Sequence, residues 1–354
     1  MIFLVTFFAL PMWVLAQDQY LMTVGGYDRS QACQHCPPWD NKVTLLSLDP
    51  NVPVPECLQS LNDFRYLQGS CMANLLGDQP HICGGWSPYG DWMEECFRYD
   101  PTQDMWTESG TLLTSRDGPS GFHGCAFSYS HGIVVAGGRG CESANCQGGP
   151  GPLPNVDYTM NGQTSGQLAE LPEGIQNSCL VALWGGDLFS AGGIDIMSWS
   201  DGPSKKAYIY NNSIKEWIQV ADMITPRERL MCGVVLAGDG SQQEVIAAGG
   251  ANDLQEALDV VEIYSVRDGD WRIGTRLPSP IMEATSVPLD TTFLILGGSN
   301  DTIWGSSYPN SDLIYRYDTD KDSWELLATR LPIAASGVAA SMVNSYIFPS
   351  CDNE

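Results

Sequence analysis

An apolar run that ends in two glycines recurs six times along this chain of 354 residues. The glycine pairs begin at positions 25, 84, 137, 192, 249 and 297, which gives spacings of 59, 53, 55, 57 and 48 residues. Each run has the length and the β-branched or aromatic content of a strand, and the glycines stop it. Such a period predicts similar structural units within one domain, whereas the length alone would suggest two domains.

A tyrosine followed by a tryptophan seven residues later marks four of these repeats. The pairs are Tyr99 and Trp106, Tyr210 and Trp217, Tyr264 and Trp271, and Tyr317 and Trp324. Because turn-forming residues lie between them, the interval predicts a hairpin with the tyrosine on a third strand and the tryptophan on a fourth. Each unit is then a four-stranded antiparallel sheet, and such sheets close radially into a propeller. We expect the aromatic pairs to pack between neighbouring sheets.

Gly-Gly, then Tyr, then Trp seven residues on, resembles the kelch repeat over residues 18–354. The resemblance implies an all-β fold: a six-bladed kelch-type β-propeller with four-stranded antiparallel blades. The first unit begins at its Gly-Gly strand, and residues 335–343 have the composition of its missing first strand. Kelch proteins close in this way, with one blade shared between the termini. Residues 346–351 fall where another Gly-Gly strand would come, so seven blades with the last incomplete is the alternative.

The first residues of the chain are typical of an export signal. Ile2 to Leu15 form an uncharged apolar stretch, and Val14 and Ala16 supply the small residues of a cleavage site after Ala16. Fourteen apolar residues are too few to span a bilayer comfortably. We therefore predict a signal peptide at residues 1–16, a single propeller domain at residues 17–354, and a secreted product without a membrane span.

The composition of the chain agrees with export and disfavours some classes of binding partner. The net charge of −25 repels phosphate backbones and anionic lipid surfaces, so nucleic acid is a poor partner. Twelve cysteines favour an oxidising compartment, where disulfides persist. In such a compartment two sequons, at Asn211 and Asn300, become candidate glycosylation sites.

The cysteines fall into two groups. Cys71, Cys125, Cys179 and Cys232 recur at intervals of 54, 54 and 53 residues in predicted first strands, which line the central channel of a propeller. We expect them to be buried, unreactive thiols, with bridging between neighbours as the alternative. The others are disulfide candidates: Cys83 with Cys96, Cys141 with Cys146, and a group of Cys33, Cys36, Cys57 and Cys351 where the termini should meet.

Motifs of metal or catalytic chemistry are weak in this sequence. Only four histidines occur, and no GxSxG, HExxH or Walker-type motif is present. Cys33 and Cys36 form a lone CxxC, which favours a disulfide loop over a zinc or redox site. Some kelch propellers are copper oxidases of the galactose oxidase type, which need histidine ligands and carry extra domains. We predict no metal, no cofactor and no catalytic residue.

Five long connections, each following a Gly-Gly strand, are the candidate binding loops: residues 27–42, 86–95, 139–155, 194–206 and 299–311. All should open on one face of the disc, and loops on a rigid scaffold commonly carry recognition. Their aromatic and acidic residues are the candidate contacts: Trp39, Trp86, Tyr89, Asp91, Trp92, Asp195, Trp199, Asp201, Asp301, Trp304 and Tyr308. The sequence predicts an extracellular, non-enzymatic protein that binds a protein or glycan. The alternatives are a secreted copper oxidoreductase and a disulfide-linked structural matrix component.

Overall fold

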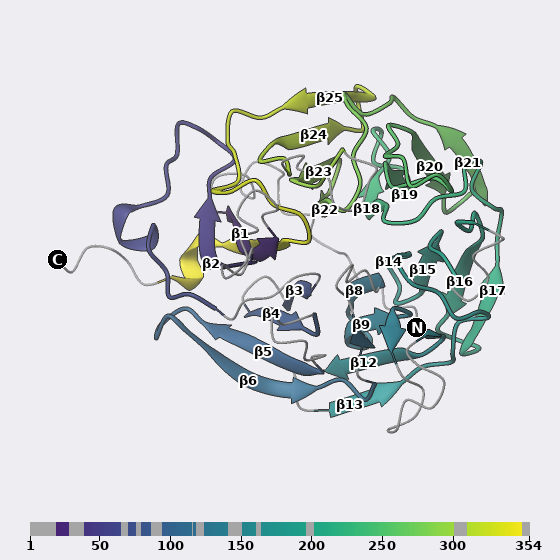
Figure 1. The fold of residues 1–354 in the computed structure, drawn as a ribbon, viewed down its shortest axis with the longest axis horizontal. Helices are drawn as coiled ribbons and strands as arrows, with labels where there is room; N and C mark the ends of the chain where they lie inside the picture. The colour runs from purple at the N-terminus through teal and green to yellow at the C-terminus, as the bar shows by residue number, and fades with distance from the viewer. Residues whose placement is uncertain are drawn as a thin grey trace, which may run out of the picture.

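The computed structural model describes residues 19–27, 39–64, 70–75, 79–85, 94–114, 116–117, 124–140, 151–160, 164–195, 202–300 and 310–348. These residues form a six-bladed β-propeller, whose antiparallel sheets stand radially around a central axis (Figure 1). The predicted six-bladed, all-β fold is therefore confirmed. The signal-peptide residues 1–16 lie outside the described part of the chain.

Blades are numbered here in the order in which the chain enters them, and their strands run from the channel outward. Blade I contains β26 (Ala339–Asn344), β1 (Gln19–Tyr27) and β2 (Trp39–Leu46). Blade II contains β3 (Cys71–Leu75), β4 (Gln79–Cys83), β5 (Glu95–Asp100) and β6 (Met105–Thr111). Blade III contains β8 (Gly124–Ser128), β9 (Gly132–Ala136), β12 (Val156–Met160) and β13 (Thr164–Gln167).

The remaining three blades repeat the same order. Blade IV contains β14 (Cys179–Ala182), β15 (Leu188–Ala191), β16 (Ala207–Asn211) and β17 (Glu216–Gln219). Blade V contains β18 (Met231–Leu236), β19 (Gln243–Ala248), β20 (Val261–Ser265) and β21 (Asp270–Ile273). Blade VI contains β22 (Thr285–Leu289), β23 (Thr292–Leu296), β24 (Ile314–Asp318) and β25 (Ser323–Leu326). A small additional sheet joins β7 (Arg116–Asp117), β10 (Arg139–Gly140) and β11 (Gly151–Pro152).

The first and last strands of the described chain pair in blade I, as the sequence predicts. Strand β26 supplies the first strand and pairs with β1 from Gln19 opposite Asn344 to Val24 opposite Ala339. In Figure 1 this yellow strand lies beside the purple β1. The described chain then turns through a short 3-10 segment, Ser345–Ile347. Without β26, the inner edge of β1 would expose unpaired backbone groups.

The Tyr and Trp repeats sit directly opposite each other on the third and fourth strands. Tyr99 pairs with Trp106, and the three later pairs have the same register, Tyr210 with Trp217, Tyr264 with Trp271 and Tyr317 with Trp324. Ring centroids in the four pairs are 5.0 to 5.4 Å apart. All four tyrosines are almost fully buried in the clusters between neighbouring blades, which confirms that these aromatics are core.

Helix is scarce in this fold. Among the residues described, it is limited to two three-residue 3-10 turns, Glu56–Leu58 and Ser345–Ile347. No helix in the described part of the chain is long and apolar enough to cross a membrane.

Candidate binding face and central channel

A central channel passes between the first strands of all six blades. It encloses a cavity of about 630 Å³. The lining includes residues of β3, β8, β14, β18, β22 and β26, most of them small, such as Ala73, Ala126 and Ala340. The first strands of the blades therefore form a ring around the channel, and the two faces of the disc lie at its two ends.

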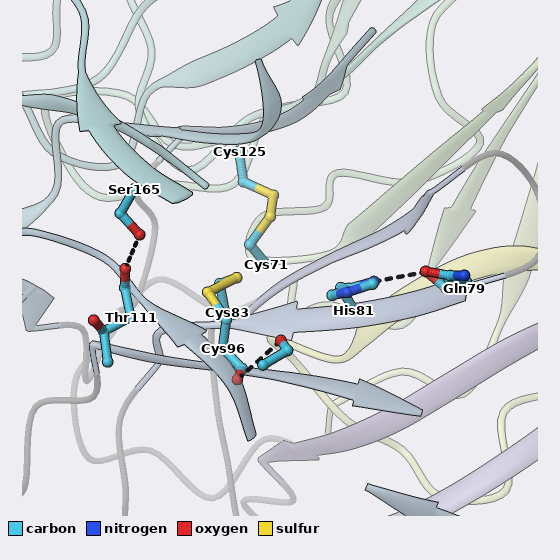
Figure 2. Close-up of a disulfide and its surroundings, with 9 residues drawn as sticks. Cys71, Gln79, His81, Cys83, Cys96, Thr111, Cys125 and Ser165 are labelled. Atoms are coloured by element: carbon cyan, nitrogen blue, oxygen red, sulfur yellow. Dashed lines mark hydrogen bonds between the residues drawn. A yellow bond between two sulfur atoms is a disulfide. The ribbon is translucent and has the colours of Figure 1, made fainter. Parts of the chain in front are cut away.

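The four repeated cysteines of these inner strands form disulfides, so our expectation of free thiols is wrong. Cys71 is joined to Cys125, and Cys179 to Cys232, with Cα atoms 5.7 and 5.9 Å apart. Figure 2 shows the Cys71–Cys125 bond crossing from blade II to blade III. The alternative of bridging between neighbouring blades is correct.

Strand register explains why these cysteines meet. Cys71 and Cys179 lie opposite the residue just before a Gly-Gly pair, Cys83 and Ala191. Cys125 and Cys232 lie opposite the residue one place earlier, Val135 and Ala247. The partners of each bond are therefore offset by one residue. Nearly equal spacings in the sequence concealed this offset, because they made all four positions look equivalent.

Other cysteine predictions have mixed outcomes. Cys83 and Cys96 are joined across β4 and β5, as the sequence analysis expected (Figure 2). Cys57 is also in a disulfide. The remaining candidates, Cys33, Cys36, Cys141, Cys146 and Cys351, lie outside the described residues.

The Gly-Gly pairs define one face of the disc, which we name the Gly-Gly face. The first glycine of each pair has a φ between 60° and 67°. A Cβ on Gly137 would overlap the carbonyl oxygen of Ile175, so glycine is required there. The second glycine, such as Gly138, donates its N–H to the segment that leads into the next blade. The same bond is made by Gly193, Gly250 and Gly298, so these four Gly-Gly pairs fix the start of a loop against the neighbouring blade.

A chain of backbone hydrogen bonds runs around the channel on this face. The N–H of Arg229 donates to the carbonyl of Asn177, that of Glu283 to Arg229, and that of Gly337 to Glu283. All four residues have φ between 54° and 61° and lead into blades IV, V, VI and I. Their side chains add a buried ion pair, with Arg229 Nη1 3.1 Å from Glu283 Oε1. The residue just before each of these four residues pairs with the first residues of a loop, so the loop bases are held in a fixed arrangement: Gln176 with Ile194, Glu228 with Ala251, Met282 with Ser299 and Ser336 with Tyr27.

Sequence reasoning missed a buried ion pair in blade V. Arg227 and Glu262 are both fully buried and contact each other directly. Arg227 also donates to the carbonyls of Gly249 and Val260, at 3.1 and 2.8 Å. The remaining lone pairs of Glu262 accept the backbone N–H groups of Ile224 and Thr225. Because every charged atom is paired within the protein, this pair anchors the segment before β18 rather than offering a ligand site.

Most predicted contact residues lie outside the described part of the chain: Trp86, Tyr89, Asp91, Trp92, Trp199, Asp201, Asp301, Trp304 and Tyr308. Trp39 begins β2, and Asp195 is partly exposed directly after Ile194 on the Gly-Gly face. Antiparallel order places the connection after every Gly-Gly strand on this same face. Sequence reasoning omitted Leu254, which is 68% exposed in the short connection between β19 and β20. An apolar residue flanked by Asp253 and Gln255 was the available signal.

Histidine and acidic residues do not assemble into a metal site in the part of the chain that the structure describes. His81 is fully buried, and its Nδ1 lies 2.8 Å from the carbonyl oxygen of Gln79 (Figure 2). His131 packs edge-on against Tyr158, with ring centroids 5.5 Å apart. Burial lowers the pKa of both histidines below its ordinary value. Asp318, which begins the turn between β24 and β25, accepts the N–H groups of Asp320 and Lys321.

No protein-family model matches the chain. The geometry of the described residues is that of a propeller with two pairs of inner strands cross-linked by disulfides and with loop bases held on one face.

Proposed function

We propose that this protein is an extracellular kelch-type propeller that binds a protein or glycan partner through the loops of its Gly-Gly face. The observation that carries the proposal is the chain of hydrogen bonds from Asn177 to Gly337, which fixes four loop bases around one channel mouth. A rigid scaffold lowers the entropic cost of ordering loops on binding. The mechanism is non-covalent, without chemical turnover.

The extracellular part of the proposal is supported by the disulfides. Three of them join described residues, and two of these link separate blades. Disulfides of this structural kind are rare in reducing compartments. The apolar stretch before Gln17 supplies the export signal, and export makes the two sequons available for glycosylation.

Capture from extracellular fluid tests the proposal directly. The secreted protein is used as bait beside three loop-face variants, Leu254→Ser, Trp199→Ser and Trp304→Ser. The matched control is Met105→Ser, because Met105 is 49% exposed and pairs with Asp100 at the hairpin turn of blade II, on the face opposite the loops. We expect the loop-face variants to lose a partner that the control retains. A partner captured equally by all four variants would overturn the loop-face assignment.

Two further measurements address the alternatives. Metal analysis of the purified protein is expected to find no stoichiometric copper, and stoichiometric copper would replace binding by oxidase chemistry. Non-reducing gels are expected to show monomer, whereas disulfide-linked multimers would favour a structural matrix component.

A further inference from the structure

An exposed apolar patch lies on the face opposite the loops, which carries the turns between first and second strands and those between third and fourth strands. It consists of Tyr129, Trp184 and Ile214, which are 81%, 58% and 55% exposed. The turn that bears Trp184 lies against Ser130, because a Cβ on Gly186 would overlap the Ser130 hydroxyl. The same turn is tied to the Ile214 turn, since Asn212 donates its N–H to Asp187 Oδ1 at 2.8 Å. The three side chains therefore stand on turns that contact one another, and exposed apolar surface of this kind commonly has an occupant.

The sequon at Asn211 stands at the edge of this patch. Asn211 ends β16, one residue beyond Tyr210, which pairs with Leu188 just after the Trp184 turn. Its Oδ1 accepts the N–H groups of Ser213 and Ile214, at 2.9 and 3.2 Å. Within the described residues its Nδ2 forms no hydrogen bond. Nδ2 is the atom to which an N-linked glycan is attached.

Equivalent turns in other blades show that the amide is not needed for the turn itself. Asp100 and Asp318 occupy the same place, and their Oδ1 atoms accept the same pair of backbone N–H groups. In blade V the hydroxyl of Ser265 accepts a backbone N–H at this position. An oxygen acceptor is what the turn requires. The nitrogen of Asn211, followed by a serine two residues on, is therefore left for another role.

We propose that Asn211 carries an N-linked glycan whose first sugars lie over Trp184 and the rest of the patch. Sugar rings have apolar faces that pack on aromatic rings, and their hydroxyls keep the covered surface soluble. The glycan stands on the face opposite the loops, so it leaves the Gly-Gly face open. Asn300 is exposed on the Gly-Gly face, where a glycan would stand among the binding loops. This inference rests on the proposed export from the cell.

The test uses the full chain secreted from cultured eukaryotic cells. Peptide mass spectrometry before and after N-glycosidase treatment is expected to find a glycan on Asn211. Asn211→Asp removes the attachment atom but keeps the turn acceptor, as in Asp100 and Asp318. Ser213→Thr is the matched control, because it changes the turn while it retains the sequon, and it is expected to remain glycosylated.

A second readout tests whether the glycan covers the patch. Asn211→Asp is expected to raise the binding of a hydrophobic dye severalfold without lowering the melting temperature. Adding Trp184→Ser to Asn211→Asp should abolish that rise, whereas Trp184→Ser alone should change dye binding little in the glycosylated protein. Glycosylation without any rise in Asn211→Asp would show that the glycan does not cover Trp184.

Failure of this inference can be distinguished from failure of the proposed function. A secreted, disulfide-bonded protein with unmodified Asn211 overturns this inference and leaves the proposed function standing. Self-association of the secreted protein that Trp184→Ser abolishes would assign the patch to a second copy instead. A cytosolic product with reduced cysteines would overturn the proposed function and this inference together.

Discussion

Blades IV to VI and the closing pair, blades I and II, use the same strand order but hold their neighbours differently. In blades IV, V and VI the tryptophan indole N–H donates to a carbonyl of the preceding blade, at Ala169, Ala221 and Thr275, over 2.8 to 2.9 Å. In blade II the indole N–H of Trp106 is buried and has no hydrogen-bond partner among the described residues. Blades IV to VI thus combine the aromatic packing of the tryptophan with a hydrogen bond to the preceding blade. Blade II has only the aromatic packing.

Blade I explains the loss. It has three hydrogen-bonded strands among the described residues, and the place of a fourth is taken by the segment around Phe64. The N–H of Phe64 donates to the carbonyl of Asn41 in β2, and its ring packs 4.7 Å from that of Trp106. An aromatic contact therefore replaces the hydrogen bond at this junction. Closing a propeller through its termini leaves one blade assembled from remote segments, with fewer strands to offer its neighbour.

The largest expected effect comes from breaking the closing blade. Deleting residues 335–354 removes β26 and leaves β1 as an unpaired edge facing the channel. We expect the truncated chain to unfold or aggregate, as measured by size-exclusion chromatography and circular dichroism. A truncated chain that stays monomeric and melts like the wild type would show that blade I does not need the C-terminal strand.

The next prediction compares a disulfide of blades IV and V with one of blade II. Cys179–Cys232 closes 53 residues between blades IV and V, whereas Cys83–Cys96 closes 13 residues within blade II. In the chain-entropy model these loops correspond to about 4 and about 3 kcal/mol. Replacing each pair by alanines should therefore lower the free energy of unfolding more for Cys179 and Cys232. Denaturant melts measure both, and the reverse order would show that native packing outweighs chain entropy here.

The variants Trp324→Phe and Trp106→Phe, at two partly buried positions, test the contribution of the indole hydrogen bond between blades. Both variants lose similar apolar contact, but only Trp324→Phe leaves a carbonyl, that of Thr275, without its donor. We expect Trp324→Phe to cost about 1 kcal/mol more than Trp106→Phe, the typical net contribution of one hydrogen bond. Equal losses would mean that solvent satisfies the Thr275 carbonyl in the variant.

The last effect depends on pH and concerns a histidine in the core of blade II. His81 lies three residues before its Gly-Gly pair, where the other blades have Met22, Val134, Phe189, Ile246 and Leu294. Burial lowers the pKa of His81 below 6.5, so below that pH the unfolded chain takes up a proton that the folded chain does not. Stability should be full above pH 6.5 and fall as the pH drops below it, by at most about 1.4 kcal/mol per pH unit.

Thermal melts from pH 7.5 to 5 check this expectation. His81→Leu places an apolar residue there, as in the other blades. We expect the melting temperature of this variant to depend less on pH. His131→Leu serves as a comparison in blade III, because burial also lowers the pKa of that histidine. An unchanged slope in His81→Leu would contradict the assignment.

The amino-acid sequence predicted the repeat, six blades in preference to seven, and the hairpin register of the aromatic pairs. These features follow from local spacing, because a turn of fixed length places Tyr264 opposite Trp271 wherever it occurs. It also located the closing strand, since an incomplete first unit requires a strand from elsewhere. Candidate loops could be placed on one face because antiparallel order alternates the two ends of each strand.

How neighbouring blades meet could be seen only in the folded structure. The pairing of Cys71 with Cys125 depends on a one-residue offset between strands that share no hydrogen-bonded ladder, so spacing could not reveal it. The ion pair of Arg227 and Glu262 joins residues 35 positions apart whose burial is set by surrounding segments. The adjacency of Trp184 and Asn211 likewise arises where two turns of one blade come together. Such contacts depend on the relative placement of separate segments, which local sequence patterns do not encode.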